Sequence, residues 1–342
     1  MAKKDDRARS TIYDIAERAG TSGSTVSLVL NGSWQRYRIN PDTAERVREA
    51  ADALGYRANQ RARGLRLSRS SLVGMAIPHY RNRFFAGLAE AFEAEARGRG
   101  LCPVVVSTQR DPQTERFVVG ALVAQQVERI IIAGVHEPDD LNEICRTAGI
   151  ACVNLDLPGR RAPSVVSDNR GAARRLTRIL AEEVAARGAS SGSIVFLGGS
   201  PGEYATEERL AGFAEAFGGS VRPDQIVRCG YSPGAAEAVF EEWAASGAFP
   251  PGVFINSITA LEGFSAVLRR RPGIGAETCV ACFDWDPFAA ALPVPIAMMR
   301  QDVDAMIAAC FRILDEGAAD PAERIVVPTA LEVVAAFGER GR

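Results

Sequence analysis

Long apolar runs and clustered cysteines are scarce in this sequence of 342 residues, and both shortages limit what the protein can be. No stretch reaches the roughly 18 apolar residues of a membrane-spanning helix, and no apolar signal-peptide core follows the charged start MAKKDDRARS. The seven cysteines are scattered, as unpaired thiols in a reducing compartment are. Cys279 and Cys282 form a C-x-x-C pair, but in an apolar strand this spacing places the thiols on opposite faces. We therefore expect a cytoplasmic protein with no membrane partner and no metal site at this pair.

Histidine is equally scarce, and its positions exclude one class of enzyme. Residues 198–202 have the G-x-S-x-G pattern that places a nucleophilic serine between a strand and a helix in hydrolases. That fold needs its histidine after the serine, whereas the two histidines, His79 and His136, both precede Ser200. A catalytic triad in the required order is therefore impossible. No Gly-rich phosphate loop follows the candidate strands, and we expect neither an enzyme nor a cofactor.

Charge is unevenly distributed, although the net charge is only −2. Residues 1–70 carry a net charge of +6, and the remaining residues carry −8. This asymmetry is typical of a basic segment that binds a polyanion, joined to a body with another task. The alternative is a basic surface that only faces solvent. The length and the 47% of hydrophobic residues predict two or three domains with sizeable cores.

Three short helices are predicted at the start of the chain. They span residues 12–19, 23–30 and 41–54. Thr11 with Asp14 is a short version of the capping box, and Ser22 is a typical N-cap. Asn40 followed by Pro41 is a cap followed by a proline in the first helical position.

The second of these helices has one apolar side and one hydroxyl side. The apolar side holds Val26, Val29 and Leu30, and the other side holds Ser22, Ser24, Thr25 and Ser27. A row of hydroxyls is unsuited to a core but suits the phosphates of DNA. The pattern therefore predicts a helix-turn-helix, in which the second helix enters the major groove.

Residues 58–67, ANQRARGLRL, connect this head to the body. Isolated helices shorter than about 12 residues are marginal in water, and Gly64 weakens this one by roughly 1 kcal/mol more. We expect a hinge that becomes ordered when DNA and a second copy of the chain hold it. The alternative is an ordinary linker.

From residue 71 onward, short apolar runs alternate with amphipathic stretches. The candidate strands are SLVGMAIP, CPVVVST, RIIIAGV, ACVNLD, SIVFLGG, QIVRCGY, GVFIN, TCVACFD and PIAMMR. Strands that alternate with helices predict parallel sheets with helices on both faces. The number of strand–helix units is too large for one small doubly wound domain and fits two. The sequence therefore predicts an α/β body with two such subdomains.

Side chains that suit a sugar follow several of these strands. Polyols are bound by groups with paired donors and acceptors and by an aromatic wall. The candidates are Asn82, Phe84, Phe85, Asp156, Arg209, Ser257, Asp284 and Gln301. Each alone is compatible with a surface or capping role. Ligands of parallel sheets bind at the carboxyl ends of the strands, so the shared position of these residues predicts one site.

The head and the start of the body resemble a known family. TIYDIAERAGTSGSTVSLVLNG and RINPDTAERVREAADALGYRAN are similar to the headpiece of the lactose-repressor family of bacterial transcription regulators. RARGLRLSRSSLVGMAIP is similar to that family's hinge and first core strand, and residues 71–335 resemble its core of the periplasmic-sugar-binding-protein type. The implied domains are a helix-turn-helix domain at 1–57, a hinge at 58–70 and an effector-binding core at 71–342. The implied subdomains of the core are 71–168 with 301–328, and 169–299 with 329–342.

The resemblance also implies contacts with DNA. Base contacts in the major groove fall on Gly23 and Ser24, which are small, so we expect DNA shape and the hinge to carry more of the specificity. Leu65 would insert into the minor groove at the operator centre. The residues implied to contact the DNA backbone are Thr11, Ser22, Thr25, Ser27 and Asn31 in the head, and Asn59, Arg61, Arg63 and Arg66 in the hinge. The long connection SWQRYRIN adds Arg36 and Arg38 as candidates.

The effector ligands implied by the resemblance are Phe85, Asp156, Arg209, Ser257, Asp284 and Gln301. Two positions depart from the family, which often has an arginine where Leu157 stands and an acidic residue where Ile258 stands. FLGGSPGEYATEERLAGF and INSITALEGF are most similar to the fructose and sucrose repressor branch, which implies fructose or a phosphorylated fructose. Arg81, Arg83 and Arg209 are the candidates for facing a phosphate.

These observations predict a homodimeric transcription regulator, most often a repressor in this family. It would bind palindromic double-stranded DNA under the control of a small sugar or sugar phosphate. Two alternatives are a transport binding protein and a sugar-active enzyme that uses the head only for localisation. The missing signal peptide and the basic head argue against the first, and turnover of a sugar panel would reveal the second.

Overall fold

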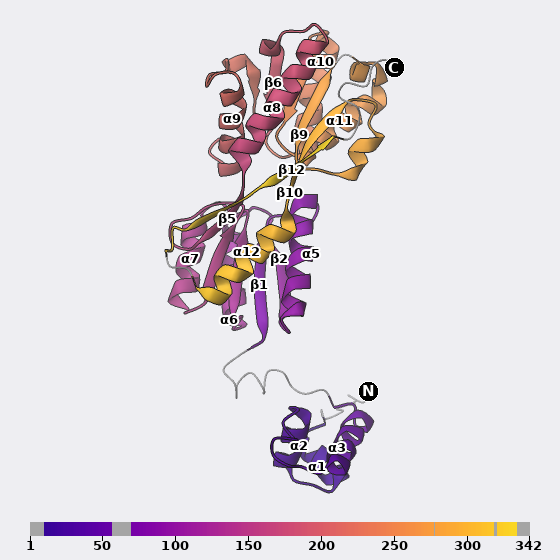
Figure 1. Cartoon of the computed structure of the whole chain (residues 1–342), viewed down its shortest axis with the longest axis vertical. Coiled ribbons are helices and arrows are strands. Elements are labelled where there is room, and N and C mark those ends of the chain that lie inside the picture. The colour runs from indigo at the N-terminus through magenta and orange to yellow at the C-terminus, as the bar shows by residue number, and fades with distance from the viewer. Residues whose placement is uncertain (1–9, 57–69, 277, 318–319, 334–342) are drawn as a thin grey trace, which may run out of the picture. The chain divides into compact units, whose positions relative to one another are not determined.

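The structure is a computed structural model in which residues 10–56, 70–276, 278–317 and 320–333 are described. The chain divides into two compact units, residues 1–70 and residues 71–342 (Figure 1). The first unit is helical where it is described, and the second contains two mainly parallel sheets. The expected class, an α/β body preceded by a helical head, is confirmed.

The described part of the head contains α1 Ile12–Ala19, α2 Gly23–Leu30 and α3 Pro41–Ala53. The predicted caps begin these helices. Thr11 and Asp14 form a reciprocal capping box, the Ser22 side chain accepts from a backbone N–H of α2, and the Asn40 side chain accepts from one of α3. Gly20 ends α1 in the left-handed conformation, with φ of +63°, which glycine adopts without strain.

Small apolar side chains from all three helices form the core of the head. Its buried members are Ile15, Ala16, Ala19, Val26, Val29, Ala44, Val47, Ala50 and Ala51. Alanine and valine let short helices approach closely, so a core of this size is enough to hold them together. The hydroxyl side of α2 is left outside this core.

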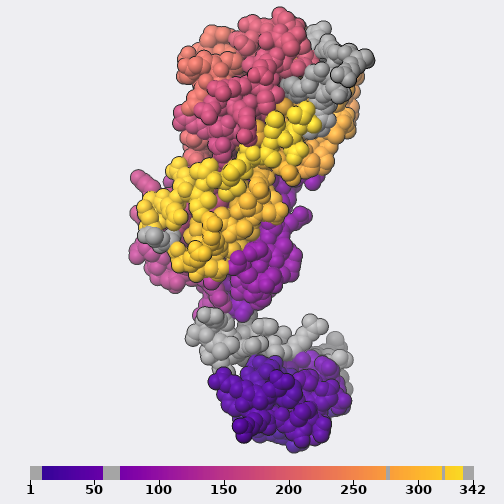
Figure 2. Space-filling view, in the orientation of Figure 1, coloured from indigo at the N-terminus to yellow at the C-terminus, as the bar shows by residue number. Residues whose placement is uncertain are grey.

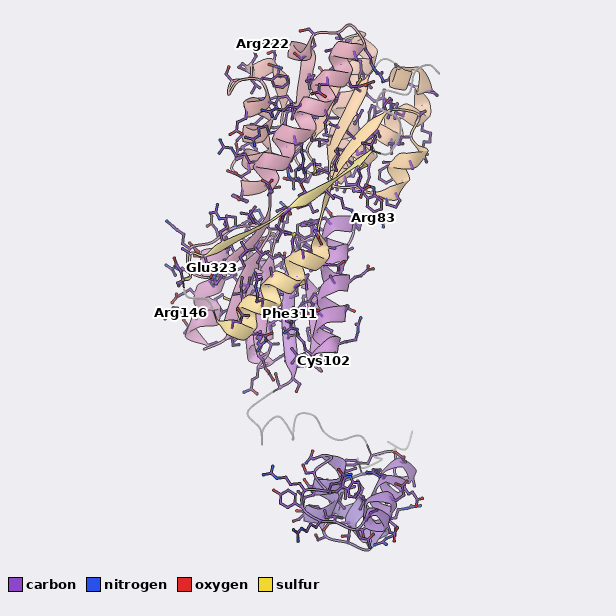
Figure 3. The ribbon with its side chains drawn as sticks, in the orientation of Figure 1. Arg83, Cys102, Arg146, Arg222, Phe311 and Glu323 are labelled. Atoms are coloured by element: carbon purple, nitrogen blue, oxygen red, sulfur yellow. The ribbon has the colours of Figure 1, made fainter. Side chains whose placement is uncertain are left out.

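The first sheet of the body has the strand order β11-β5-β4-β3-β1-β2, and all of its pairs are parallel. Its strands are β1 Leu72–Ile77, β2 Cys102–Ser107, β3 Arg129–Ala133, β4 Ala151–Leu155, β5 Ser164–Ser167 and β11 Arg324–Val327. Its helices are α5 Arg83–Gly98, α6 Pro112–Ala124, α7 Pro138–Thr147 and α12 Val303–Glu316. Helices α5 and α12 pack on one face, where Phe311 stacks on Phe92, and α6 and α7 pack on the other (Figure 3).

The second sheet has the order β12-β10-β9-β8-β6-β7. Its strands are β6 Ile194–Leu197, β7 Ile226–Val227, β8 Gly252–Ile255, β9 Cys279–Phe283, β10 Ile296–Gln301 and β12 Thr329–Val333. Its helices are α8 Asn169–Ala186, α9 Tyr204–Ala216, α10 Pro233–Ser246 and α11 Ile258–Arg270. Short 3-10 turns η1 Ser191–Ser193, η2 Pro223–Gln225, η3 Pro272–Ala276 and η4 Pro287–Ala291 join some of these elements. Helices α8 and α9 cover one face, and α10 and α11 cover the other.

Strand β12 is the exception to parallel pairing, because it runs antiparallel to β10. It follows β11 after the single residue Pro328. Strand β11 runs parallel to β5 and emerges at the carboxyl edge of the first sheet, so the chain enters the second sheet from that sheet's own carboxyl edge. Of the described strands, β5, β11 and β12 were not among the candidates from the sequence. The first two are four residues long, and β12 is five residues long.

The two sheets define two subdomains, which the described chain joins at three places. These are the passage from β5 into α8, the passage from β10 into α12, and the step from β11 into β12. Figure 2 shows the yellow C-terminal segment extending across both subdomains on one face. The carboxyl edges of the two sheets therefore face each other where the chain crosses.

Cys279 and Cys282 lie on opposite faces of the second sheet, as their spacing predicts. Cys279 packs in the cluster under α8 and α9, and Cys282 packs in the cluster under α10 and α11. Among the described residues no three histidine, cysteine or acidic side chains gather in a group that could hold a metal ion. Within the same residues, no helix combines the length and the apolar character needed to cross a membrane.

Candidate ligand pocket and nucleic-acid interface

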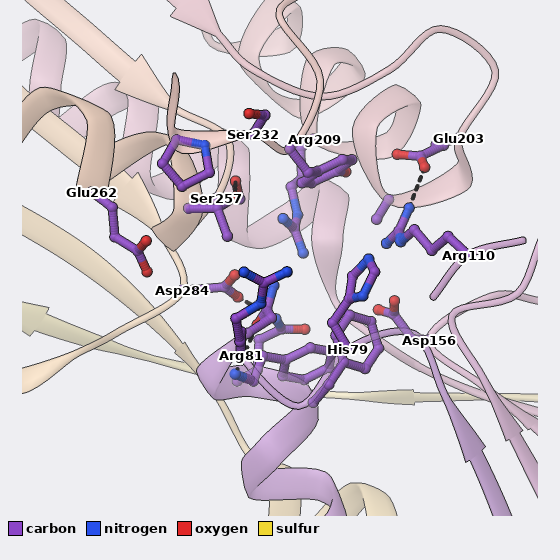
Figure 4. Close-up of a pocket in the computed structure, with 18 of the residues that line it drawn as sticks. His79, Arg81, Arg110, Asp156, Glu203, Arg209, Ser232, Ser257, Glu262 and Asp284 are labelled. Atoms are coloured by element: carbon purple, nitrogen blue, oxygen red, sulfur yellow. Dashed lines mark hydrogen bonds and ion pairs between the residues drawn. The ribbon is translucent and has the colours of Figure 1, made fainter. Parts of the chain in front are cut away.

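A cavity of about 420 Å³ lies between the two subdomains, where the carboxyl edges of the sheets face each other (Figure 4). This volume lies within the usual range for small-molecule sites, about 300–1,000 Å³. The cavity is lined by all six of the residues that the family resemblance implies as effector ligands: Phe85, Asp156, Arg209, Ser257, Asp284 and Gln301. The structure therefore brings together side chains that are separated by more than 200 residues of sequence.

Asp156 and Asp284 hold equivalent positions, each directly after a buried strand of its own subdomain. Both have a left-handed backbone, with φ of +71° and +83°. Such a conformation costs a non-glycine residue of the order of 1–3 kcal/mol and persists where surrounding structure enforces it. The sheets enforce it here, because the N–H of Asp156 donates to Val165 O at 2.9 Å and that of Asp284 donates to Met299 O at 3.1 Å. Both carboxylates are thereby held against the cavity.

Arg209 supplies a fixed cation beside both carboxylates. It lies on α9 and is only 3% exposed. Its Nε donates to Asn169 Oδ1 at 2.8 Å, and its Nη1 donates to the backbone oxygen of Asn256 at 2.7 Å. The guanidinium also lies over the ring of Phe283, 3.7 Å from its centre. These contacts fix the guanidinium plane, so its remaining N–H groups have a fixed direction.

Gln301 links the two subdomains through a chain of buried hydrogen bonds. Its Nε2 donates to Asp284 Oδ1, and its Oε1 accepts from Ser167 Oγ at 2.5 Å. Ser167 ends β5, and Gln301 ends β10, just before the chain crosses. A change at Asp284 can therefore alter the hydrogen bonds at two of the passages between the subdomains, the one after β5 and the one after β10.

Burial sets the protonation of the cavity carboxyls. Desolvation raises the pKa of Asp156 from 3.8 to about 6, although the nearby Arg209 and Arg110 lower it. Burial also raises the pKa of Asp284, against the opposing effects of Arg209 and the hydrogen bond from Gln301. The pKa of His79 is lowered by burial and by nearby arginines, which favours the neutral imidazole. The carboxyls of Asp156 and Asp284 are thus weaker acids than usual. Hydrogen bonds donated by a ligand would favour their ionised forms.

A further wall of the cavity was not identified from the sequence. Arg110 follows β2 in the first subdomain and forms an ion pair with Glu203, which precedes α9 in the second (Figure 4). The guanidinium of Arg110 lies 5.0 Å from the ring centre of Tyr231, and His79 lines the cavity nearby. Arg110 and His79 follow strands, so the strand-end argument could have included them. The pairing of Arg110 with Glu203 depends on how the subdomains meet, which has no local signal.

The other candidates have different surroundings. Arg83 lies at the start of α5 (Figure 3) and was considered as a phosphate ligand. It does not line this cavity and instead forms an ion pair with Asp286. Arg81 does line the cavity and is exposed. Ser257 Oγ lies 2.8 Å from Thr259 Oγ1, and Phe85 is only 3% exposed. Phe85 therefore presents little of its ring to a ligand.

The G-x-S-x-G segment at residues 198–202 is a turn after β6, and no hydrogen bond found among the described residues joins it to a histidine. A Cβ at Gly199 would lie 2.4 Å from Thr206 Oγ1, and Gly199 has φ of +75°. Thr206 in turn bonds Tyr231 and lies beside Asn256. The glycine permits close packing of this turn onto α9, which brings Glu203 and Arg209 to the cavity.

The outer side of α2 is the candidate nucleic-acid interface. Ser22, Ser24 and Asn31 are exposed, and Gly23, Thr25 and Ser27 are half-buried. Ser22 and Thr25 share a hydroxyl hydrogen bond of 2.9 Å, and Asn31 Nδ2 donates to Ser27 Oγ at 3.3 Å. The predicted hydroxyl side therefore exists as one continuous polar surface, with Thr11 exposed at the start of α1.

Tyr13 is a prominent surface residue that the sequence analysis did not single out. It is 74% exposed, and its ring lies beside Gly23, with Cε1 in ordinary van der Waals contact, 3.6 Å from the position that a Cβ would take there. An aromatic on the polar side of α1 was the available signal. Arg36 and Arg38 are also exposed, and Arg38 has φ of +53°. The hinge candidates Asn59, Arg61, Arg63, Leu65 and Arg66 lie outside the described residues.

The fold and these two sites define a class of protein: a helix-turn-helix head joined to a core of two subdomains, with a ligand cavity between the two subdomains. Comparison with known families agrees. The profile of the periplasmic binding protein domain matches residues 73–292, and that of the bacterial regulatory proteins of the lacI family matches residues 11–59. The chain belongs to the lacI family of bacterial regulatory proteins and is a DNA-binding transcription regulator.

Individual relatives extend this comparison. The chain is 43% identical to the ribitol operon repressor of Klebsiella aerogenes over 189 residues, which are 55% of this chain and 70% of that protein. It is 28% identical to the sucrose operon repressor of Klebsiella pneumoniae over 334 residues, covering 95% of this chain and 98% of the relative. The crystal structure of the lac repressor dimer bound to operator and the anti-inducer ONPF has the same fold. It matches with a TM-score of 0.79 at 22% identity and covers 95% of this chain and 98% of that one.

Proposed function

We propose that this chain is a homodimeric repressor that binds a palindromic operator and is controlled by an uncharged sugar or sugar alcohol. The effector occupies the cavity between the subdomains, and the head reads the DNA. Two heads are needed for the two half-sites of a palindrome. The proposal places the protein in the cytoplasm and gives it no enzymatic activity.

One observation carries the choice of effector class. Asp156 Oδ1 and Glu203 Oε2 are buried atoms that have no hydrogen-bond partner among the described residues, and both side chains line the cavity. Leaving a buried acceptor unpaired costs about 1–3 kcal/mol, and more when it is charged. Ionised carboxylates only accept hydrogen bonds, so their complement is a ligand rich in donors. The hydroxyl groups of a polyol satisfy this requirement.

The charges of the cavity favour an uncharged polyol over a phosphorylated one. Its lining contains the carboxyls Asp156, Glu203, Glu262 and Asp284, against the guanidiniums Arg81, Arg110 and Arg209. Leu157 also lines the cavity, at the position where the family often has an arginine. The name of the ribitol operon repressor supports a sugar alcohol, and that of the sucrose operon repressor supports an uncharged sugar.

For the DNA, we propose that α2 lies in the major groove with its hydroxyl side against the phosphates. Thr11, Ser22, Thr25, Ser27 and Asn31 would contact the backbone, and Gly23 and Ser24 would face the bases. Tyr13 would supply contact area beside Gly23, since its exposed ring lies next to that residue. Arg38 and the hinge residues Asn59, Arg61 and Leu65 complete the proposed interface.

A ligand screen followed by DNA binding tests this function. The thermal unfolding midpoint of the full chain is measured with ribitol, other pentitols, hexitols, fructose, sucrose and fructose 1-phosphate. Each compound that raises the midpoint is added to a titration of fluorescent operator DNA. We expect an uncharged polyol to stabilise the protein and change operator affinity. Stabilisation by fructose 1-phosphate alone would contradict the proposed effector class.

A further inference from the structure

We propose that Glu203 is the specificity residue that makes this cavity reject phosphorylated effectors, because it neutralises Arg110 and keeps a second, unpartnered carboxylate oxygen at the same wall. The inference rests on the proposed function, since it concerns the same cavity. It goes beyond it by assigning the discrimination to one residue outside the set of six ligands.

The ion pair between Arg110 and Glu203 belongs to the wall of the cavity and is not an isolated ion pair on the outer surface. Arg110 and Gln109 both have left-handed backbones, with φ of +55° and +56°, although neither is glycine. Consecutive residues in this region are strained, and such strain tends to occur at functional sites. The strained turn brings Arg110 across to the second subdomain, where it meets Glu203 and the ring of Tyr231.

Arg110 is the guanidinium that a phosphate would otherwise find at this wall. Arg209 already donates to Asn169 and to Asn256 and lies close enough to Asp156 and Asp284 to lower the pKa of both. Arg110 instead has one acidic partner, Glu203, among the ion pairs of the described residues. Glu203 is therefore the carboxylate that pairs directly with this guanidinium, while Asp156 lies near enough for Arg110 to lower its pKa.

Glu203 also keeps one carboxylate oxygen without a partner. Its pairing with Arg110 uses Oε1, while Oε2 is buried and has no partner in the described part of the chain. Rotation of the carboxylate toward the cavity would bring this oxygen to a ligand hydroxyl, which can donate to it. A phosphate monoester carries about 1.5–2 negative charges at neutral pH and acts mainly as an acceptor, so it would meet this oxygen with repulsion. One side chain thus attracts hydroxyls and repels phosphate.

The test compares Glu203→Gln with the wild type and with Glu215→Gln. Glu215 is a matched control, because it lies on α9, the helix that Glu203 precedes, and pairs with Arg170 and Arg174 but does not line the cavity. Binding of ribitol, fructose, fructose 1-phosphate and inorganic phosphate to the full chain is measured by calorimetry, and folding is checked by thermal unfolding. We expect Glu203→Gln to improve affinity for the two phosphate compounds by about tenfold or more, since Arg110 loses its neutralising partner. Affinity for the uncharged ligand should fall by about threefold to tenfold, because a charged acceptor becomes a neutral one.

Two outcomes separate this inference from the proposed function. If the wild type binds an uncharged polyol but Glu203→Gln gains no affinity for either phosphate compound, the role of Glu203 is wrong and the effector class stands. If no uncharged polyol binds the wild type but Glu203→Gln still gains phosphate binding that Glu215→Gln lacks, the effector class is wrong. The rejection of anions by Glu203 then stands.

Discussion

The head and the body of this protein present their candidate sites in opposite ways. In the head, the proposed DNA surface is exposed and is contributed mainly by one eight-residue helix and its caps. In the body, the proposed effector site is buried between two subdomains and takes side chains from positions 79 to 301. The hydroxyls of Ser22 and Thr25 bond each other and that of Ser27 accepts from Asn31, whereas the cavity contains four carboxyls and three guanidiniums.

The difference follows from the ligands that each site must hold. A DNA duplex is large and strongly charged, so a small convex surface with hydroxyls and nearby basic residues can bind it through many phosphate contacts. A small polyol has no net charge and little apolar area. It is bound tightly only when it is enclosed and each of its hydroxyls has a partner. If the two sites are separable in this way, a change in one should leave the other intact.

The largest expected effect is the separation of the two activities by truncation. A chain that begins at Ser71 should lose all measurable operator binding, because the hydroxyl side of α2 and the positive charge of residues 1–70 are gone. The body is a compact unit with its own cores, so it should remain folded and retain its ligand. Operator titration and calorimetry on the truncated and full chains measure both properties. Operator binding by the truncated chain would show that the body contacts DNA itself.

The next largest effect concerns the cavity alone. Asp284→Ala should weaken effector binding by about 1–3 kcal/mol, or about 5- to 150-fold, because ligand hydroxyls lose their acceptor in an enclosed site. It also removes the partner of Gln301 Nε2. Operator binding without ligand should be nearly unchanged, and the variant should fail to respond at ligand concentrations that switch the wild type. A variant that still switches at the wild-type concentration would remove Asp284 from the site.

A smaller effect is expected from the hinge. Leu65→Ala should reduce affinity for the specific operator by roughly tenfold, because the minor-groove kink loses its apolar wedge. Binding to random DNA should keep its affinity and its salt dependence, since these come from phosphate neutralisation. Anisotropy titrations with operator and random duplexes at several salt concentrations make this measurement. Equal losses on both DNAs would contradict the wedge role.

The smallest expected effect is the pH dependence of effector binding, which follows from the titration of Asp156 in the cavity. Burial raises the pKa of Asp156 from 3.8 to about 6, so the ligand-free fold holds this proton more tightly than the unfolded chain. This contribution to stability is present below pH 4 and is lost as the pH rises through about 6. A ligand that donates to the carboxylate favours its ionised form, so affinity should be about fourfold weaker at pH 5.5 than at pH 7.5. Calorimetry at both pH values measures this. In Asp156→Asn, where no carboxyl titrates, most of the difference should disappear, and its persistence would assign the titration to another group, such as Asp284.

Local signals were enough to predict the head and the general architecture of the body. The bounds of α1 and α2 agree with the sequence, because capping residues and a terminal glycine act within one turn of the helix they limit. The short strands β5 and β11 were missed because four residues such as SVVS carry little periodicity of their own. Strand β12 was also missed, and its antiparallel direction follows from the point at which the chain enters that sheet.

The candidate effector residues were predictable for a similar reason, since a residue that directly follows a parallel strand must lie at the carboxyl edge of its sheet. Asp156 and Asp284 could therefore be named before their geometry was known. Their left-handed backbones, their burial and the unpartnered oxygen of Asp156 could not. These properties depend on the neighbouring strand, the opposite subdomain and the arginine between them.

The sequence by itself determined the helix-turn-helix, the alternation of strands and helices, the absence of a hydrolase triad and the set of polar residues at strand ends. Each of these depends on residue type and on spacing over a few turns or one strand, so neighbours in the chain decide it. Only the tertiary structure decided how deeply the six candidate ligands are buried in their shared cavity, that Arg83 is paired with Asp286, and that Arg110 meets Glu203. Contacts between residues separated by 90 or 200 positions arise from the way two sheets are placed against each other. Many weak packing interactions set that placement jointly, and no short stretch of sequence encodes it.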